Sequence, residues 1–111
     1  MFRPDKTIQY MLWWLIAGTK GGGTRGQIIL TLKEMPRNAN QLAEALGMDY
    51  KTMRQHLRVL EKNKIVMQVG SGYGITYLLS PEMEEHYAEF EKVWEKVGKA
   101  KNRLLNMEEV C

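Results

Sequence analysis

Cysteine is nearly absent from this chain of 111 residues, since the single one is Cys111 at the very end. One thiol forms neither an internal disulfide nor a cysteine cluster, so the sequence calls for no oxidising compartment and we expect a cytoplasmic protein. Histidine is almost as scarce, with His56 and His86 alone. We interpret His56 as a packing or hydrogen-bonding residue and His86, among glutamates, as a lone pH-responsive group. We predict no metal and no cofactor.

Long apolar runs are also lacking. The most apolar stretch is residues 8–18, IQYMLWWLIAG, which is too short for a membrane-spanning helix of about 20 residues. Its length favours a buried or dimer-interface helix over membrane contact. No signal-peptide cleavage pattern follows it, because TKGGGTR continues into another structured segment.

Signatures of catalysis are missing as well. The glycine-rich stretch GTKGGGTRG follows an apolar helix rather than a strand, and it lacks the terminal Lys-Ser/Thr pair of a phosphate-binding loop. No nucleophile with a neighbouring base can be assembled from these residues. We therefore predict that the chain is not an enzyme, and we interpret glycines 21–23 as a linker.

Charge is present but unevenly distributed. Residues 20–64 contain nine basic and four acidic side chains, whereas residues 81–111 contain five basic and eight acidic ones. The middle of the chain is thus suited to a polyanionic partner, and its end is not.

The patterns predict a mostly α-helical protein with a small β-hairpin. After the glycines, Thr24 is expected to cap a helix that Pro36 stops. A second helix is expected to begin at Asn38, with Gln41 completing a capping box, and to end at Gly47. Asp49 is expected to cap a third helix, residues 50–62, whose buried stripe is Met53, Leu57 and Leu60.

The apolar period changes after residue 63. The segments KIVMQV and ITYLLS are rich in β-branched and aromatic residues, and GSGYG between them predicts a hairpin connection. Pro81 is then expected to start one long helix with a heptad pattern from Met83 through Leu104. We predict three segments: an apolar helix and linker (1–23), a central domain (24–80) and a C-terminal dimerisation helix (81–111).

Two helices joined by a three-residue turn and followed by a hairpin resemble a winged helix-turn-helix, here with extra N- and C-terminal helices. Residues 40–66, NQLAEALGMDYKTMRQHLRVLEKNKIV, resemble the ArsR-type winged helix-turn-helix transcriptional regulators, especially small archaeal members. The resemblance rests on Leu42, Ala43, Leu46 and Gly47 at the end of one helix, then His56, Leu57 and Leu60. It implies sequence-specific binding of double-stranded DNA by a homodimer.

With its stripe buried, the third helix presents polar donors suited to the DNA major groove. By analogy with the family, we expect Tyr50, Arg54 and Gln55 to contact bases, Lys51 and Arg58 to contact phosphates, and Thr52 to reach a phosphate or a thymine methyl. The alternative for this face is ordinary solvation. A protein-interaction module without DNA binding is the alternative for the whole chain.

The wing departs from the common pattern, because residues 68–77 contain no positive charge. Two alternatives stay open for this loop. Either Tyr73 or the backbone amides contact a DNA phosphate, or the loop only packs against the protein. Aromatic residues of the terminal helices offer a dimer interface, the alternative being packing within one chain. The predicted interface residues are Trp13, Trp14, Tyr87, Phe90, Trp94 and Val97. The sequence identifies no small-molecule effector.

Overall fold

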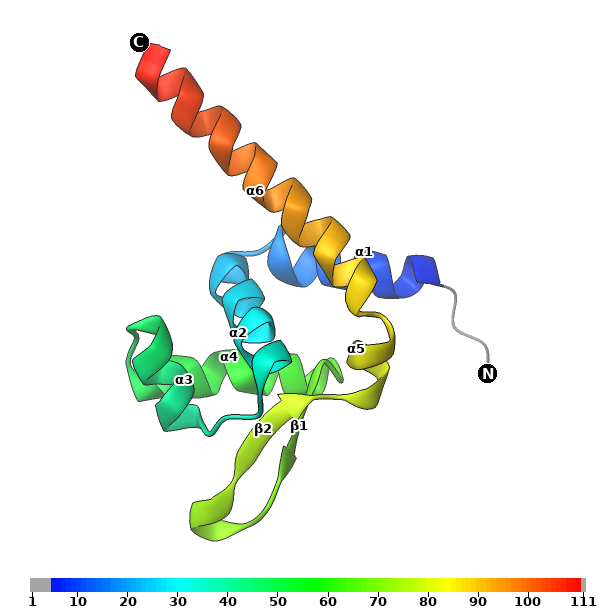
Figure 1. The fold of residues 1–111 in the computed structure, drawn as a ribbon, viewed down its shortest axis with the longest axis vertical. Coiled ribbons are helices and arrows are strands. Elements are labelled where there is room, and N and C mark those ends of the chain that lie inside the picture. The colour runs from blue at the N-terminus through cyan, green and yellow to red at the C-terminus, as the bar shows by residue number, and fades with distance from the viewer. Residues whose placement is uncertain (1–4, 111) are drawn as a thin grey trace.

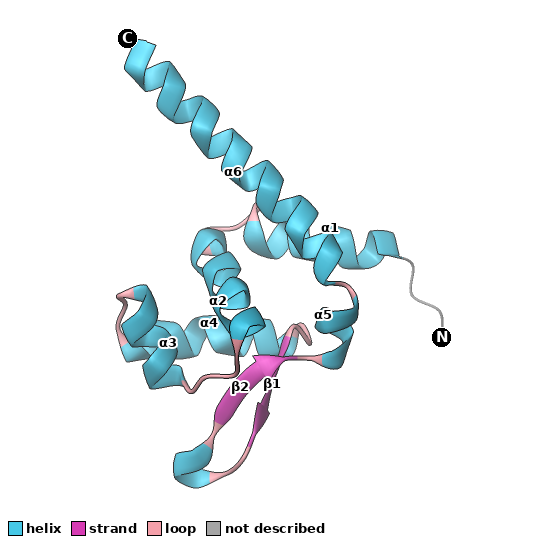
Figure 2. Cartoon of the chain, viewed as in Figure 1, coloured by secondary structure: helices cyan, strands magenta, loops and turns pink. Residues whose placement is uncertain are grey.

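The computed structural model describes the backbone of residues 5–110 and the side chains of residues 7–72 and 74–98. Its elements appear in Figures 1 and 2. In chain order they are α1 (Asp5–Ile16), α2 (Gly22–Glu34), α3 (Ala39–Leu46), α4 (Tyr50–Lys62), β1 (Val66–Val69), a 3₁₀ turn (Gly72–Gly74), β2 (Thr76–Leu79), α5 (Pro81–Glu85) and α6 (Tyr87–Val110). The predicted class, mostly helical with a two-stranded hairpin, is confirmed.

A single hydrophobic core joins all the helices and the base of the hairpin. Leu12 and Leu15 of α1 and Phe90 of α6 are buried in the same cluster as Leu57 of α4. In Figure 1 the start of α6 crosses α1, while α3 and the hairpin lie at the opposite end of the body. The two terminal helices therefore stabilise the domain that carries α4.

The turn between α1 and α2 is tight rather than a flexible linker. Helix α2 begins at Gly22, and Gly21 precedes it with a φ of +86°. A Cβ placed on Gly22 would lie 2.0 Å from the carbonyl oxygen of Ile16, so only glycine allows this approach. The predictions of a glycine linker and of a cap at Thr24 are therefore wrong.

The central pair of helices forms as the sequence predicts. The Asn38 side chain accepts a hydrogen bond from the Gln41 amide, and the Gln41 side chain accepts one from the Asn38 amide, both at 2.8 Å. Gly47 ends α3 with a φ of +64°. The Asp49 carboxylate then accepts a hydrogen bond from the Thr52 amide at 3.0 Å and caps α4. These local signals fix the angle at which α4 leaves the turn.

The hairpin pairs β1 with β2 in the antiparallel register Val66 to Leu79 and Val69 to Thr76. A third segment joins it, because the backbone of Arg37 exchanges two hydrogen bonds with that of Tyr77, at 3.0 and 2.8 Å. The loop between α2 and α3 thus anchors the hairpin to the helices. The sequence did not predict this one-residue strand, since a single bridging residue leaves no periodic pattern.

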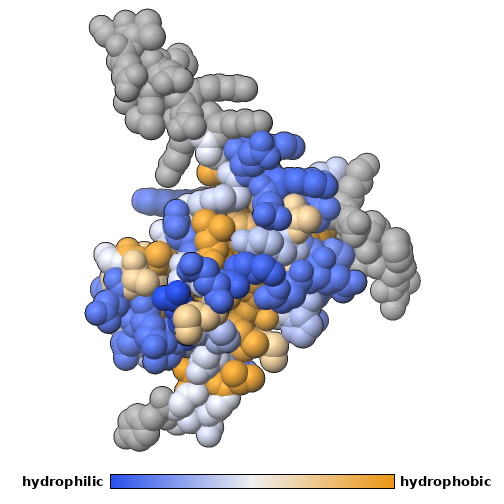
Figure 3. Space-filling model, in the orientation of Figure 1, coloured by the Kyte–Doolittle hydropathy of each residue, from blue (hydrophilic) through white to orange (hydrophobic). Residues whose placement is uncertain are grey.

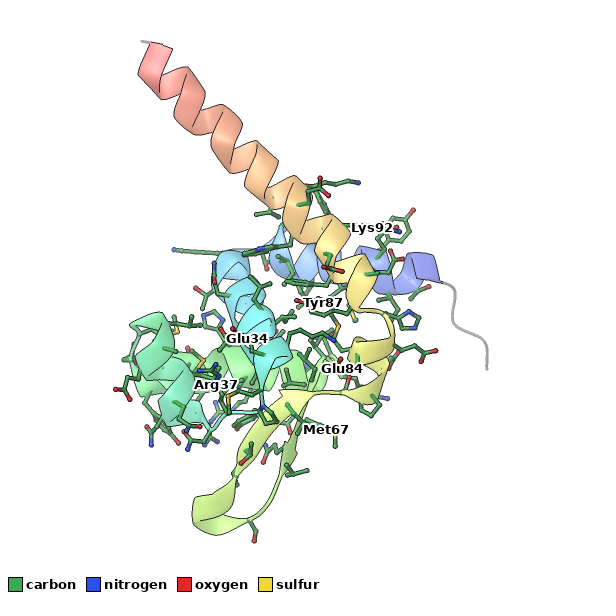
Figure 4. All side chains as sticks on the ribbon, viewed as in Figure 1. Glu34, Arg37, Met67, Glu84, Tyr87 and Lys92 are labelled. Atoms are coloured by element: carbon green, nitrogen blue, oxygen red, sulfur yellow. The ribbon has the colours of Figure 1, made fainter. Side chains whose placement is uncertain are left out.

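The predicted single helix after Pro81 is two helices, with a break at His86. Ser80 ties α5 to the hairpin base, because its hydroxyl donates to the carbonyl oxygen of Lys64 at 2.7 Å. Helix α6 instead packs on α1. Lys33 of α2 contacts both helices at this junction: its Nζ lies 2.6 Å from the carboxylate of Glu84 and 4.7 Å from the ring centroid of Tyr87. Glu84 and Tyr87 are labelled in Figure 4. Leu104, predicted to continue the heptad, lies outside the described side chains.

Candidate nucleic-acid interface

Helix α4 is buried on one side and polar on the other. Met53, Leu57 and Leu60 are fully buried, which confirms the predicted stripe. Lys51, Gln55 and Arg58 are exposed. These three predicted contact residues therefore present two cations and one amide to the solvent from the first three turns of a short, capped helix.

The other three predicted contact residues have partners within the chain. The Thr52 hydroxyl donates to Asp49 at 2.7 Å, so this side chain belongs to the cap of α4. The same hydrogen bond, followed by that of the Thr52 amide, keeps the pKa of Asp49 below its ordinary value. Arg54 is half-buried, and its Nη1 donates to the Tyr50 hydroxyl at 3.2 Å.

Tyr50 and Arg54 line a pocket of about 220 Å³ between the helix pair and the hairpin. Tyr50 is 47% exposed, and the guanidinium carbon of Arg54 lies 5.8 Å from the centroid of its ring. The hydrogen bond to Tyr50 is the main reason why the pKa of Arg54 is raised. The opposite wall is formed by Tyr77 of β2 and Gly72 of the hairpin loop. Arg54 thus lies on the hairpin side of α4.

The hairpin loop contains no charged residue, and its backbone changes direction at two glycines. Gly70 and Gly72 have φ values of +95° and +58°, and Val69 before them is exposed. The backbone of this loop is accessible, whereas the side chain of Tyr73 lies outside the described residues. Whether Tyr73 contacts a ligand stays a prediction.

A buried polar network behind α4 was not predicted from the sequence. Arg25 of α2 is buried, and its Nε donates to the carbonyl oxygen of Leu15 at the end of α1, at 2.9 Å. Its Nη2 donates to the Thr19 hydroxyl, and its Nη1 lies 3.5 Å from Nδ1 of His56. Burial lowers the pKa of Arg25, and burial followed by the charge of Arg25 lowers that of His56. Arg25 precedes Ile28 and Ile29 by three and four residues, so the apolar stripe itself pointed to this position.

The predicted dimer residues separate into two groups. Trp13 and Trp14 of α1 are 45% and 58% exposed. Tyr87, Trp94 and Val97 are half-buried against their own chain, and Phe90 is fully buried. Phe90 therefore fills the core of one chain, and its side chain is not accessible to the partner predicted for it. Of the predicted interface residues, the two exposed ones therefore lie on α1, where Lys96 of α6 approaches the Trp13 ring to 6.0 Å.

Two classes of site are absent from the described part of the chain. No helix there combines the length and apolar character needed to cross a membrane. Within those same residues, no group of three or more His, Cys, Asp or Glu side chains is arranged to hold a metal ion.

Figure 3 shows that hydrophilic side chains predominate over α3 on the visible face.

Solved structures with the same arrangement are described as transcriptional regulators, and one of them as a DNA-binding domain. A possible transcriptional regulatory protein from Mycobacterium bovis (fragment 1–100) is 22% identical with a TM-score of 0.65, covering 84% of this chain and 95% of that one. The solution structure of a homodimeric winged helix-turn-helix DNA-binding domain from Mycobacterium bovis, a possible ArsR-family regulator, is 20% identical with a TM-score of 0.64, covering 89% and 91%. The transcriptional repressor BigR from Xylella fastidiosa is 20% identical with a TM-score of 0.62, covering 79% and 78%.

At these identities the solved structures establish the fold, a winged helix-turn-helix. No curated protein sequence matches the chain significantly. The family model of the N-terminal domain of the methanogenesis regulatory protein FilR1 matches residues 19–79, more than half of the chain. The chain therefore belongs to the family of this regulatory domain.

Proposed function

We propose that the chain is a sequence-specific DNA-binding transcriptional regulator that acts as a homodimer, with α4 in the major groove. The observation that carries this proposal is the exposed face of α4, which presents Lys51, Gln55 and Arg58 to the solvent next to the side of the helix where Tyr50 and Arg54 line the pocket toward the hairpin. An α-helix fits the major groove, and the first residues of a recognition helix reach base edges. Membership in a regulatory family supports the same reading.

Each exposed side chain has a distinct proposed role. Gln55 matches the hydrogen-bonding edge of adenine, because its amide offers one donor and one acceptor. Lys51 and Arg58 flank it and neutralise phosphates on either side of the groove. Thr52 contributes its methyl group at most, since its hydroxyl is used by the cap.

Dimerisation is proposed through α1 together with the adjoining surface of α6. Trp13 and Trp14 are large exposed apolar side chains on one helix, an arrangement that favours a protein contact. The Mycobacterium bovis neighbour, which is homodimeric in solution, supports the proposal. Two α4 helices in a symmetric dimer would read half-sites about 34–36 Å apart.

The salt dependence of DNA binding tests the proposed interface. Affinity for a random-sequence duplex should fall steeply with salt, with a log-log slope of about −0.9 for each phosphate neutralised. Arg58→Gln should flatten that slope by about 0.9 for each phosphate that it no longer neutralises, whereas Lys92→Gln, an equal charge change on exposed α6, should not. Absence of duplex binding at low salt would reject the proposal and favour a protein-interaction module.

A further inference from the structure

The hairpin loop has no cationic side chain, but α4 places Arg54 next to it. The loop residues 70–74 contain no charged side chain, yet Arg54 lines the pocket that this loop closes. Tyr50 holds the guanidinium there by a hydrogen bond, while the face of α4 toward Gln55 stays open. The positive charge of Arg54 is therefore directed to the wing side of the helix.

The pocket offers several donors that converge with Arg54. Ala39 and Asn40, the first two residues of α3, line it, and no described residue accepts a hydrogen bond from their amide groups. Such amides at a helix start carry the positive end of the helix dipole and suit an anion. The Tyr50 hydroxyl and the Asn40 side chain add further polar groups.

The charge of Arg54 is not neutralised inside the pocket. Among the lining residues none is acidic, and in the described structure the Tyr50 hydroxyl is the one acceptor of a hydrogen bond from the guanidinium. Glu61 does not line the pocket, and its carboxylate accepts a hydrogen bond from the Gln68 side chain at 3.0 Å. A half-buried cation next to free amides favours an oxyanion, and the planar guanidinium fits a phosphate group.

We propose that this pocket binds one phosphate of the DNA backbone. Arg54 then supplies, on the hairpin side of α4, the positive charge that the hairpin loop 70–74 lacks. The inference rests on the proposed DNA binding, and it moves Arg54 from the base contact predicted by analogy to a phosphate contact. Tyr50 then acts as a positioning residue, because it fixes the guanidinium at the pocket. Sequence discrimination falls to Gln55 on the open face.

The test compares two neighbouring variants on two kinds of DNA. Arg54→Met keeps the apolar stem and removes the charge, and Gln55→Ala serves as the matched control. Binding is measured against salt, on a random duplex and on a duplex selected for tight binding by the unaltered protein. Arg54→Met should weaken binding by the same factor on both duplexes and flatten the log-log slope by about 0.9 for the phosphate left without its cation. Gln55→Ala should keep the slope and lose the preference for the selected duplex.

Two further variants keep the test decisive. Tyr50→Phe retains the charge, so the salt slope should stay while affinity falls less than in Arg54→Met. Arg54→Lys should also retain the slope, and it applies even where Arg54→Met disturbs folding. If Arg54→Met instead keeps the slope and loses discrimination, Arg54 is a base reader; this inference is then wrong while the proposed function stands.

A free anion is the other source of a phosphate group. Inorganic phosphate, titrated while the Nε–Hε signal of Arg54 is followed by NMR, should shift that signal only weakly and should be displaced by duplex DNA. Tight saturable phosphate binding that duplex DNA does not displace would overturn the inference. Failure of the unaltered protein to bind any duplex would overturn the inference and the proposed function together.

Discussion

The turn between α1 and α2 depends on the absence of a Cβ atom at particular glycines. Three consecutive glycines look interchangeable in the sequence, but they occupy three different environments. Gly21 has a left-handed backbone, a Cβ placed on Gly22 would overlap the carbonyl oxygen of Ile16, and no atom lies within 4 Å of a Cβ placed on Gly23. Such differences arise from tertiary contacts, so the sequence alone predicted only a flexible break there.

Substitution of the neighbouring glycines should have opposite effects. Gly22→Ala should destabilise the fold by about 1–3 kcal/mol, because its Cβ has no room beside Ile16. Gly23→Ala should stabilise it by about 0.5 kcal/mol, since alanine restricts the unfolded chain and meets no clash. Urea unfolding of both variants measures the difference. Equal stability of the two would contradict the tight turn.

The burial of His56, together with the neighbouring charge of Arg25, should make stability depend on pH. The pKa of His56 is lower in the folded chain than in the unfolded chain, so between the two values the unfolded chain binds more protons. The contribution of His56 is therefore present above its unfolded pKa and is lost as the pH falls through the folded pKa. Unfolding experiments on the native protein and His56→Gln should show a smaller loss of stability between pH 8 and pH 5 in the variant. An identical loss would show that His56 is not the group responsible.

The elements that the sequence predicted well are those built from local signals. Asn38, Gln41, Gly47 and Asp49 act within a few residues of their own helix ends, and the stripe of α4 follows one helical period. The break at His86 depends instead on two different neighbours, because Ser80 joins α5 to Lys64 beside the hairpin whereas α6 packs on α1. A heptad pattern cannot distinguish a continuous helix from one that breaks at His86, because the apolar spacing is the same in both. The apolar spacing of α2 indicates that Arg25 is buried, but its partners Leu15 and His56, like the pocket wall around Arg54, come from elements distant in the sequence.

Helix α6 should be needed for the stability of the single chain, apart from any role in dimerisation. Phe90→Ala should destabilise the protein by about 3–5 kcal/mol, because the ring is fully buried in the common core. Glu91→Ala, at the next and exposed position, should change the melting temperature little. Thermal unfolding measures both. For the same reason, truncation after Ser80 should unfold the chain rather than yield folded monomers, which differs from a purely dimerising role for residues 81–111.

The molecule places its two proposed surfaces at opposite ends. Helix α1, with the exposed tryptophans, crosses α6 at one end, whereas α3 and the hairpin lie at the other (Figure 1). Between them, Arg25 contacts both the last turn of α1 and His56 of α4. This arrangement would leave the proposed DNA-binding surface free if two chains joined through α1 as proposed.

Removal of the exposed tryptophans should separate the dimer without unfolding the chain. The double variant Trp13→Ala, Trp14→Ala should sediment as a monomer at concentrations where the native protein is dimeric, since large apolar contacts dominate such interfaces. Met35→Ala is the matched control, because Met35 is similarly exposed but lies outside α1. A double variant that stays dimeric would place the interface elsewhere.

DNA recognition is tested most sharply by amide chemical-shift mapping by NMR while a short duplex is added to the labelled protein. We expect the largest changes in the first turns of α4, at the start of α3 and in the loop 70–74, with little change along α1. Changes concentrated on α1 and α6, or no changes at low salt, would show that α4 and the hairpin do not form the DNA-binding surface.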